Sequence, residues 1–336
     1  PDSVCPSSFV FAPWLMFSAV SQCLRLLRSR HLLCMNRRNA RYITPGNPRR
    51  FYRLVDEKLR TKRIAHNAGV PCPQTYGVVA TYGEIGRVLA HVVKRHETFV
   101  IKPNRGAAGR GVLVLERAEE HAWRKPSGAC LSFNDLRYHI TSVLSGLYSL
   151  SELPDEALIE QRIFPHPFFE NIIWGGTPDV RIVLYQTVPV LAMIRLPTRR
   201  SDGRANLHQG AVGLGVGVTT GVTCSAVLRS VPVARHPDTN EPLLGLHVPA
   251  WSDVIASARL LARDIPLNYI GVDLMLDAVH GPMMIEANAR PGLAIQVANQ
   301  IGLRPRLEFL QHLFDRGVDR DQAWQELQHR IADGSV

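Results

Sequence analysis

Three oxygen-bearing side chains near the C-terminus have the chemistry of a divalent-cation site. Glu286 lies in the apolar stretch 283–287, Asn288 follows it directly, and Asp273 lies in an earlier apolar stretch, 272–276. Turn-forming residues separate the stretches, which favours a β-hairpin. Side chains two residues apart on a strand share a face, and Asp273 can reach that face from the partner strand. Such oxygens suit Mg²⁺, which proteins usually bind together with substrate phosphates; the alternative is an exposed hairpin with solvated acids.

A glycine-rich segment upstream has the composition of a phosphate-binding loop. Residues 99–101 form an apolar strand that leads into Lys102, and a second apolar strand is expected at 112–115. The glycines between them are Gly106, Gly109 and Gly111. Small residues let backbone N–H groups approach an anion, and a phosphate would supply the partner that a buried lysine needs. The lysine precedes the glycines and the loop joins two strands, which excludes a Walker A loop and a dinucleotide fingerprint.

These segments belong to an ordered set that resembles the ATP-grasp ligases, especially the branch that joins glutamate or other amino acids to a carboxyl group. The matching segments, all within residues 51–303, are VDEKLRTK (55–62), FVIKPNRGAAGRG (99–111), ALIEQRI (157–163), PDVRIVLY (178–185), GRANLHQGA (203–211), GVDL (271–274) and IEANARPG (285–292). Three further segments are similar to the subgroup of alpha-L-glutamate ligase-related proteins: MNRRNARYI (35–43), NPRRFY (47–52) and LPTRRSDGRANLHQGAVG (196–213).

The resemblance implies an α+β, ATP-grasp fold, in which two α/β subdomains hold ATP between them. Residues 51–156 are then the N-terminal subdomain with the glycine-rich loop. Residues 157–336 are the C-terminal subdomain with the metal site. Family ligases usually carry a full α/β domain before the helix that holds Lys58. In this chain a short, helical and basic N-terminal extension, residues 1–50, is expected in place of that domain.

The resemblance also implies roles for individual residues. Adenine is expected at the backbone of Glu160 and Gln161, and the ribose hydroxyls at Asp179. Arg181 and Arg290 would orient a carboxylate or the transferred phosphoryl group. The other nucleotide-binding residues are Lys58, Lys102, Gly106, Gly109, Gly111, Arg204 and Asn206, the catalytic residues are Arg181, Arg204 and Arg290, and the metal ligands are Asp273, Glu286 and Asn288. The alternative for each is an ordinary structural or surface role.

The implied reaction is ATP-dependent amide formation with Mg²⁺, or Mn²⁺ in its place. A substrate carboxylate attacks the γ-phosphate, and an amine then attacks the resulting acyl-phosphate. The expected substrates are ATP and small-molecule or peptide carboxylates and amines, with glutamate or another amino acid added. A nucleotide-binding regulatory or partner-binding module without ligase activity is the alternative. The intact set formed by Lys102 and the three metal ligands favours the enzyme.

Apolar periodicity and turn residues predict the elements that position these side chains. Helices are expected at 53–68, 82–95, 133–148, 251–263 and 304–332. Besides the strands named above, strands are expected at 76–79, 157–163, 180–186 and 188–195. Residues 36–50 are expected to form an irregular connection. Residues 197–221 contain six glycines and three arginines, which indicates a mobile loop that orders over substrate.

The charge is concentrated at the N-terminus. Residues 1–50 contain eight arginines and one acid, Asp2, and so carry +7 of the chain's net charge of +10. No nucleic-acid-binding motif accompanies these arginines, so a nucleic-acid partner is not favoured. The apolar run 9–20 lacks a basic segment before it, unlike a signal peptide. It is expected to pack on the protein, and a peripheral membrane or protein contact through residues 1–50 is the alternative.

The six cysteines show no CxxC spacing and indicate no disulfide framework. This pattern, with the need for ATP, favours a cytoplasmic location, and membrane association remains the alternative. Met35 begins the family-like MNRRN, so residues 1–34 are expected to be an upstream extension or part of a longer chain.

Overall fold

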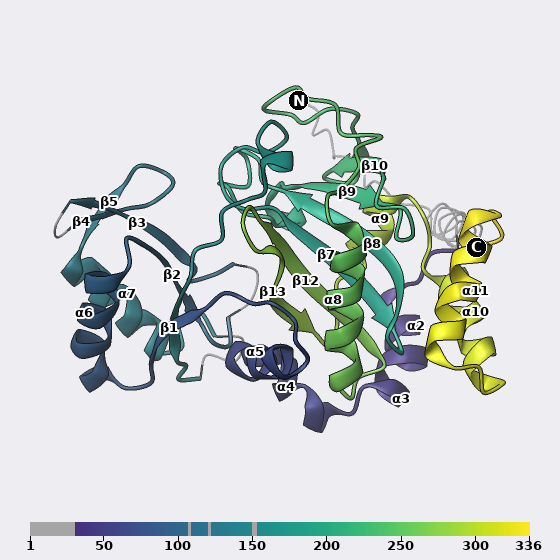
Figure 1. The fold of residues 1–336 in the computed structure, drawn as a ribbon, viewed down its shortest axis with the longest axis horizontal. Helices are drawn as coiled ribbons and strands as arrows, with labels where there is room; N and C mark the ends of the chain where they lie inside the picture. The colour runs from purple at the N-terminus through teal and green to yellow at the C-terminus, as the bar shows by residue number, and fades with distance from the viewer. Residues whose placement is uncertain (1–30, 107–108, 120–121, 150–152) are drawn as a thin grey trace, which may run out of the picture.

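Two antiparallel sheets lie side by side in the computed structural model of the chain (Figure 1). The structure describes residues 31–106, 109–119, 122–149 and 153–336. The apolar run 9–20, on which the membrane alternative depends, lies outside the described residues. Among the described residues, no helix is long and apolar enough to cross a membrane.

The smaller sheet has six strands in the order β1-β6-β2-β3-β4-β5. Its strands are β1 (Thr75–Val79), β2 (Thr98–Pro103), β3 (Leu113–Glu119), β4 (Ala122–Arg124), β5 (Cys130–Ser132) and β6 (Ala157–Glu160). The helices packed on it are α6 (Ile85–Arg95), which follows η3 (Tyr82–Glu84), and α7 (Phe133–Leu144). Phe99, Ile101, Leu115 and Trp123 are buried between the sheet and these helices, so this half has its own core.

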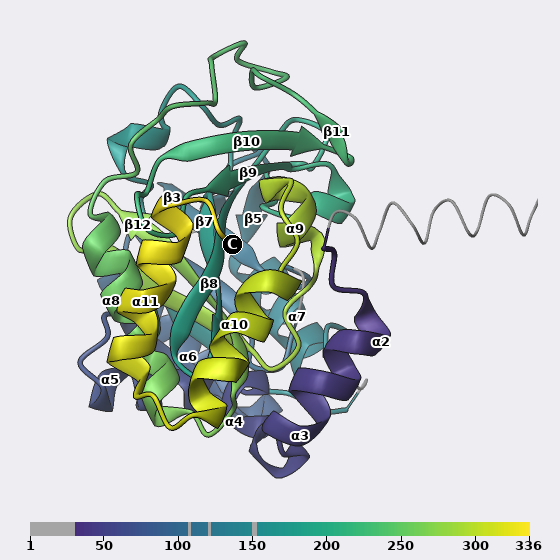
Figure 2. The same ribbon diagram turned by 90° about the vertical axis from the view of Figure 1, so that its right-hand side faces the viewer.

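The larger sheet has seven strands in the order β11-β10-β9-β8-β7-β12-β13. Its strands are β7 (Asp179–Tyr185), β8 (Val188–Leu196), β9 (Val212–Val216), β10 (Thr223–Leu228), β11 (Val231–Pro232), β12 (Tyr269–Asp277) and β13 (Gly281–Asn288). The helices around it are α8 (Trp251–Asp264), α9 (Ala294–Asn299), α10 (Arg304–Asp315) and α11 (Arg320–Ala332), and two short turns are η4 (Pro167–Phe169) and η5 (Leu207–Gln209). Helices α10 and α11 lie together at the end of the molecule away from the smaller sheet (Figure 1), the end that faces the viewer in Figure 2.

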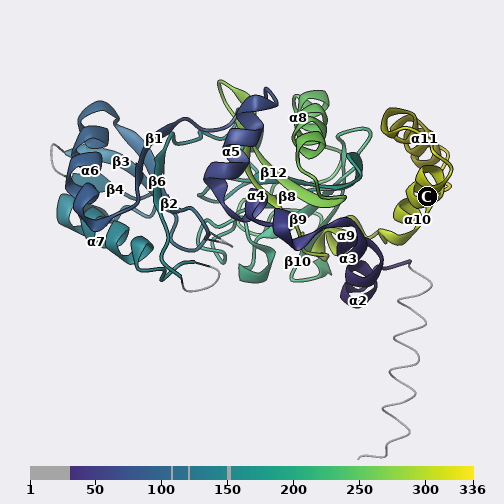
Figure 3. The same cartoon turned by 90° about the horizontal axis from the view of Figure 1, so that it is seen from below.

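Helices α4 (Arg53–Asp56) and α5 (Lys58–Asn67) connect the two halves. They precede the smaller sheet in the sequence, but both pack against β13, the edge strand of the larger sheet (Figure 3). Val55 and Ala65 are buried in the larger core. The hairpin expected around the metal ligands is present as β12 and β13, in which Asp273 pairs with Glu286.

Residues 36–46 and 49–50 are helical, which confirms the helical N-terminal extension where the structure describes it and corrects the irregular connection expected at 36–50. The helical segments are α2 (Met35–Arg38), η1 (Asn39–Ile43), α3 (Thr44–Gly46) and η2 (Arg49–Phe51). Tyr42 and Ile43 are buried in the larger core. Asn47 is buried too, and its amide nitrogen donates to the carbonyl oxygens of Tyr269 at 2.6 Å and Ala289 at 2.9 Å. Tertiary packing, which polar composition does not reveal, therefore orders this segment.

Three other expectations need correction. The helix expected at 304–332 is two helices, because Gly317 has a φ of +78° and Asp319 caps α11 with its side chain. The loop expected at 197–221 includes strand β9. The boundary expected after residue 156 falls one strand early, because β6 pairs with β1 and β2 of the smaller sheet.

Candidate functional site

Two lysines from different elements meet at one buried carboxylate. Lys102 on β2 and Lys62 on α5 both form ion pairs with Glu160 on β6, and the Lys62 Nζ to Glu160 Oε2 distance is 2.8 Å. All three side chains are buried. Burial acts to raise the pKa of Glu160, but the two lysines outweigh it and hold this pKa below its ordinary value. The partner of Lys102 is thus a carboxylate, where the sequence suggested only a phosphate.

Lys58 forms two hydrogen bonds with the start of the glycine-rich loop. Its Nζ donates to the Gly106 carbonyl oxygen at 2.6 Å, and its backbone N–H donates to the Asn104 carbonyl oxygen at 3.1 Å. Burial lowers the pKa of Lys58, and the carboxylate of Glu286 opposes this effect. Helix α5, which carries Lys58, also packs against β13, so one helix contacts both the glycine loop and the strand of the metal candidates.

The described part of the loop needs its glycines for conformation and space. Gly111 has a φ of +70°, and a Cβ there would lie 2.5 Å from the ring of Tyr148. His139 Nε2 also contacts the Gly111 carbonyl oxygen at 3.0 Å, so helix α7 holds this end of the loop. Gly109 likewise has a positive φ. Ala107 and Ala108 lie outside the described residues.

Four charged side chains form a network across β7, β8 and β12. Arg181 Nε donates to Asp273 Oδ1 at 2.7 Å. Arg195 Nη2 donates to Asp273 Oδ2 and to Asp179 Oδ2, both at 2.7 Å. The strand register explains this network: Asp273 is the cross-strand neighbour of Arg181, and Asp179 is that of Arg195. Directly opposed side chains on paired strands lie within contact distance.

Burial and ion pairing set the protonation of this network. Burial acts to raise the pKa of Asp273, but Arg181 and Arg195 outweigh it and hold the pKa well below its ordinary value. For Asp179, burial dominates and raises the pKa to about 6 in spite of Arg195. Burial acts to lower the pKa of Arg195, but Asp179 and Asp273 outweigh it and raise this pKa. Asp273 and Arg195 are therefore fully charged at neutral pH.

The metal candidates lie together on the β12–β13 hairpin. Asn288 Nδ2 donates to Glu286 Oε1 at 3.2 Å, and Arg181 Nη2 lies 3.9 Å from the same oxygen. Glu286 and Asn288 are partly exposed, and their oxygens fit a hard cation. Asp273 is 1% exposed and both of its oxygens accept from arginines. Its Oδ2 accepts from both arginines, whereas Oδ1 accepts from Arg181 alone and keeps a lone pair that could face the same cation.

Among the described residues, Arg204 and Asn206 of the 198–210 loop make no ion pair or side-chain hydrogen bond with the charged network. Arg204 is exposed and its nearest acidic oxygen, Asp202 Oδ2, is 3.9 Å away. The side-chain oxygen of Asn206 accepts from the His208 N–H at 3.0 Å and so serves the loop itself. A Cβ on Gly176 would lie 1.8 Å from the Gly203 carbonyl oxygen, so only glycine permits this close approach of two loops.

The remaining predicted residues lie at the edges of the site. The Gln161 N–H donates to the Gln74 carbonyl oxygen at 2.8 Å, so this donor is already used within the protein. Arg290 follows β13 and is exposed, with its guanidinium carbon 5.4 Å from the centre of the Tyr52 ring.

Sequence reasoning missed Arg195 and Lys62. Arg195 is the only charged residue in the otherwise apolar strand β8, and that contrast could have identified it. Lys62 gave no comparable signal, because a lysine on a helix is usually solvated. Only the folded structure, in which Lys62 Nζ lies 2.8 Å from Glu160 Oε2, reveals this contact.

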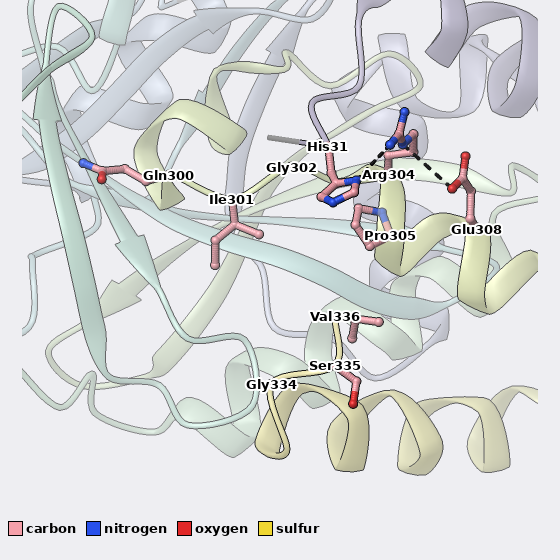
Figure 4. A pocket seen from close by; sticks show the side chains of 10 residues that line it. All are labelled: His31, Gln300, Ile301, Gly302, Arg304, Pro305, Glu308, Gly334, Ser335 and Val336. Atoms are coloured by element: carbon pink, nitrogen blue, oxygen red, sulfur yellow. Dashed lines mark hydrogen bonds and ion pairs between the residues drawn. The ribbon is translucent and has the colours of Figure 1, made fainter. Parts of the chain in front are cut away.

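A cavity elsewhere does not belong to this site. It has a volume of about 540 Å³ and lies beside α10 (Figure 4). His31, Arg304 and Glu308 are among its lining residues, and Arg304 Nη2 lies 2.8 Å from His31 Nδ1. None of the residues discussed above lines it, so its size alone does not make it the nucleotide site.

Comparison with known families agrees with this geometry. The model of a family described as sugar-transfer associated ATP-grasp matches residues 37–312. The chain belongs to this family. The resemblance to the ATP-grasp ligases and the ATP-grasp fold are thereby confirmed. The match begins at Arg37, so it includes most of the helical segment that precedes α4.

Individual relatives are more distant. The chain is 26% identical over 252 residues to a protein named "Probable alpha-L-glutamate ligase" from Thioalkalivibrio sulfidiphilus. The aligned region covers 75% of this chain and 61% of that protein. It thus spans about three-fifths of the length of that relative.

Among solved structures, the ATP-grasp ligase PsnB, complexed with a phosphomimetic variant of minimal precursor, Mg and ADP, is 14% identical with a TM-score of 0.42; the match covers 90% of this chain and 73% of that chain. Biotin carboxylase from Campylobacter jejuni is 15% identical with a TM-score of 0.47, covering 74% and 43%. The D-cycloserine synthetase DcsG is 17% identical with a TM-score of 0.41, covering 88% and 82%.

Proposed function

We propose that this protein is an ATP-dependent ligase that joins a carboxylate to an amine through an acyl-phosphate. The observation that carries the proposal is the position of α5: its Lys58 contacts the glycine loop at Gly106, and the helix packs against β13, which carries Glu286 and Asn288. A phosphate chain at this point would meet Lys102 and loop N–H groups from the smaller half, and Lys58 and metal-binding oxygens from the larger half.

The nucleotide would bind between the two sheets. Lys58, Lys102 and the backbone N–H groups of the glycine loop would contact its phosphates. Adenine would lie at the end of strand β6, beside Glu160 and Gln161, and the Gln161 N–H would exchange its contact with the Gln74 carbonyl oxygen to bind it. Asp179 would face the ribose. Family membership and the closeness of these elements support the assignment.

Glu286 and Asn288, with Asp273 as a third candidate, would hold Mg²⁺ or Mn²⁺. A bound cation of this kind neutralises charge on phosphate oxygens during transfer. Arg181 already reaches towards Glu286, and would keep the substrate carboxylate or the transferred phosphoryl group near the hairpin.

The reaction has two steps. A carboxylate oxygen of the substrate attacks the γ-phosphorus, and the bond from that phosphorus to the bridging oxygen of ADP breaks. The amine nitrogen of the second substrate then attacks the acyl carbon, phosphate leaves, and the amine loses a proton. Neither step needs a protein nucleophile, because positioning and charge neutralisation supply most of the catalysis in phosphoryl transfer. Arg181, Arg204 and Arg290 are the arginines we assign to this task.

Glutamate or another amino acid is the substrate that we favour for one of the two positions, joined to a peptide or small molecule. The similarity to the protein named as a probable alpha-L-glutamate ligase supports this choice.

The test is ADP release and product mass in the presence of ATP, Mg²⁺ and panels of carboxylates and amines. Glu286→Gln and Asn288→Ala should each reduce turnover by at least about a hundredfold while the far-UV circular dichroism spectrum stays unchanged, because they remove ligand oxygens outside the core. Glu326→Gln, an exposed change on α11, is the matched control and should keep full turnover. ATP binding without ADP release for any substrate pair would instead indicate a nucleotide-binding module.

A further inference from the structure

A carboxylate and a guanidinium beside the metal hairpin lie near each other without pairing. Asp56 is at the end of α4, and its backbone N–H donates to the Tyr52 carbonyl oxygen at 2.8 Å, so the two residues are one helical turn apart on one face. The Arg290 guanidinium lies over the ring of Tyr52. Helix α4 packs against β13, whose last residue is Asn288. Asp56, Tyr52 and Arg290 therefore form one cluster next to the metal candidates.

Asp56 has no hydrogen-bond or ion-pair partner for its carboxylate among the described residues, although the side chain is partly buried. Burial raises its pKa, and Arg290 and Lys58 oppose this effect from a distance. Leaving a partly buried carboxylate without a partner has a free-energy cost. The neighbouring Glu57 differs, because arginines surround it.

The carboxylate of Glu57 forms ion pairs with nearby arginines of α4, of α5 and of the glycine loop. Its oxygens accept from Arg53 Nε at 3.0 Å, from Arg105 Nη2 at 3.1 Å, and from Arg60. None of these arginines contacts Asp56 in the described structure. Arg290, in turn, has no ion pair with any described acid. The cluster thus contains one negative and one positive group that are both available to a ligand.

The backbone on both sides of Arg290 is fixed by the N-terminal helical segment. Arg38 is buried, and its Nη1 donates to the Pro291 carbonyl oxygen at 2.7 Å. Asn47 donates to the Ala289 carbonyl oxygen at 2.9 Å. Because both flanking carbonyl groups are held, Arg290 projects from a rigid support, as a recognition residue should.

We propose that Asp56 and Arg290 form a subsite for a zwitterionic amino acid, which is the amine substrate of the ligase. The ammonium group would pair with Asp56 and the carboxylate with Arg290, while the Tyr52 ring would form an apolar wall. A guanidinium presents paired donors that match a carboxylate, and an ammonium presents three donors to an acid. An α-amino acid carries both groups on one carbon, so it can bridge two side chains that do not touch each other. This inference rests on the proposed ligase function for its reaction, but not for its binding.

Binding is tested first, without turnover. Saturation-transfer NMR would be recorded for each common L-amino acid, and for its α-amide, with the full chain in the presence of ADP and Mg²⁺. We expect a signal for at least one amino acid and a signal at least about tenfold weaker for its α-amide, because a charge-assisted contact with Arg290 is lost. No signal for any amino acid, or equal signals for acid and amide, would overturn the proposal.

Variants then separate this subsite from the nucleotide site. Asp56→Asn should weaken amino-acid binding at least about tenfold, with ATP affinity unchanged in calorimetry. Arg290→Gln should weaken amino-acid binding to a similar extent. Arg37→Gln is the matched control, because Arg37 is exposed and pairs with Glu308 on α10 instead. Unchanged amino-acid binding in Asp56→Asn would overturn the proposal.

Where ADP release is observed, steady-state kinetics provide a further test of the subsite. There Asp56→Asn should raise the KM for the amine substrate at least about tenfold and leave the KM for ATP unchanged. If the amino acid binds but no substrate pair releases ADP, the ligase function fails while the subsite stands. If ADP is released equally with amino acids and their α-amides, the subsite fails while the ligase function stands.

Discussion

At the scale of single residues, the site contains two buried carboxylates, each of which forms ion pairs with two cationic side chains. Glu160 forms ion pairs with Lys62 and Lys102, and Asp273 forms ion pairs with Arg181 and Arg195. Each acid is buried, and each is kept ionised by partners that outweigh the cost of burial. A ligand that enters must therefore exchange contacts with charges that are already paired. Lys102 is such a case, because a phosphate oxygen would compete with Glu160 for it.

Glu160→Gln should destabilise the protein by about 3–5 kcal/mol, because it leaves two buried lysines without a negative partner. The native pKa of Glu160 lies below its unfolded value, so its contribution to stability is present above the ordinary glutamate pKa and is lost as pH falls through the lower native value. Urea unfolding from pH 7 to pH 3 measures both effects. The wild type should lose more stability than the variant as the pH falls. Equal pH dependence of the two proteins would show that Glu160 is not held ionised.

At the scale of elements, the sequence predicted the strands and the hairpin that local apolar patterns and turn residues determine. The β12–β13 hairpin followed from two apolar stretches and the turn between them, and the strand before Lys102 followed from its apolar run. The partner of each charge was not predictable, because Arg195 meets Asp179 only through the β7–β8 register. The same holds for the segment 35–46, whose polar composition suggested a connection while its buried Tyr42 and Ile43 make it helical and integral.

Asn47→Ala should test this integration. It removes three hydrogen bonds, two to carbonyl oxygens and one from the Tyr269 N–H at 2.9 Å, inside the protein. Buried backbone groups left without partners should lower the free energy of unfolding by about 2–3 kcal/mol. Asn36→Ala, an exposed change in α2, is the control and should stay within about 0.5 kcal/mol of the wild type. A similar small effect of both changes would mean that the segment is not needed to hold the ends of the hairpin.

At the scale of the whole molecule, two cores of different size share one site. The smaller sheet and its two helices form a separate cluster, while α4, α5 and the N-terminal segment belong to the larger core. Contacts between the halves include buried polar ones, such as the pair of Lys62 with Glu160 and the hydrogen bonds from the start of α5 to Asn104. A ligand bound by Lys58, Lys102 and Glu286 would touch both halves. Because such a ligand binds only the native state, it should stabilise the arrangement of the two halves against opening.

The two halves should therefore differ in local stability until a nucleotide connects them. Each fully buried large apolar side chain contributes about 1.5–3 kcal/mol, so the half with the smaller core should open at a lower free energy. In hydrogen exchange without nucleotide, the amides of β2 and β6 should exchange faster than those of β7 and β12. ATP with Mg²⁺ should slow exchange in β2 and β6 more than in β7 and β12, and Lys58→Met should reduce this effect because it removes the contact with Gly106. Equal protection of the two sheets without nucleotide, or a nucleotide effect confined to one sheet, would contradict the division into two cores that share one site.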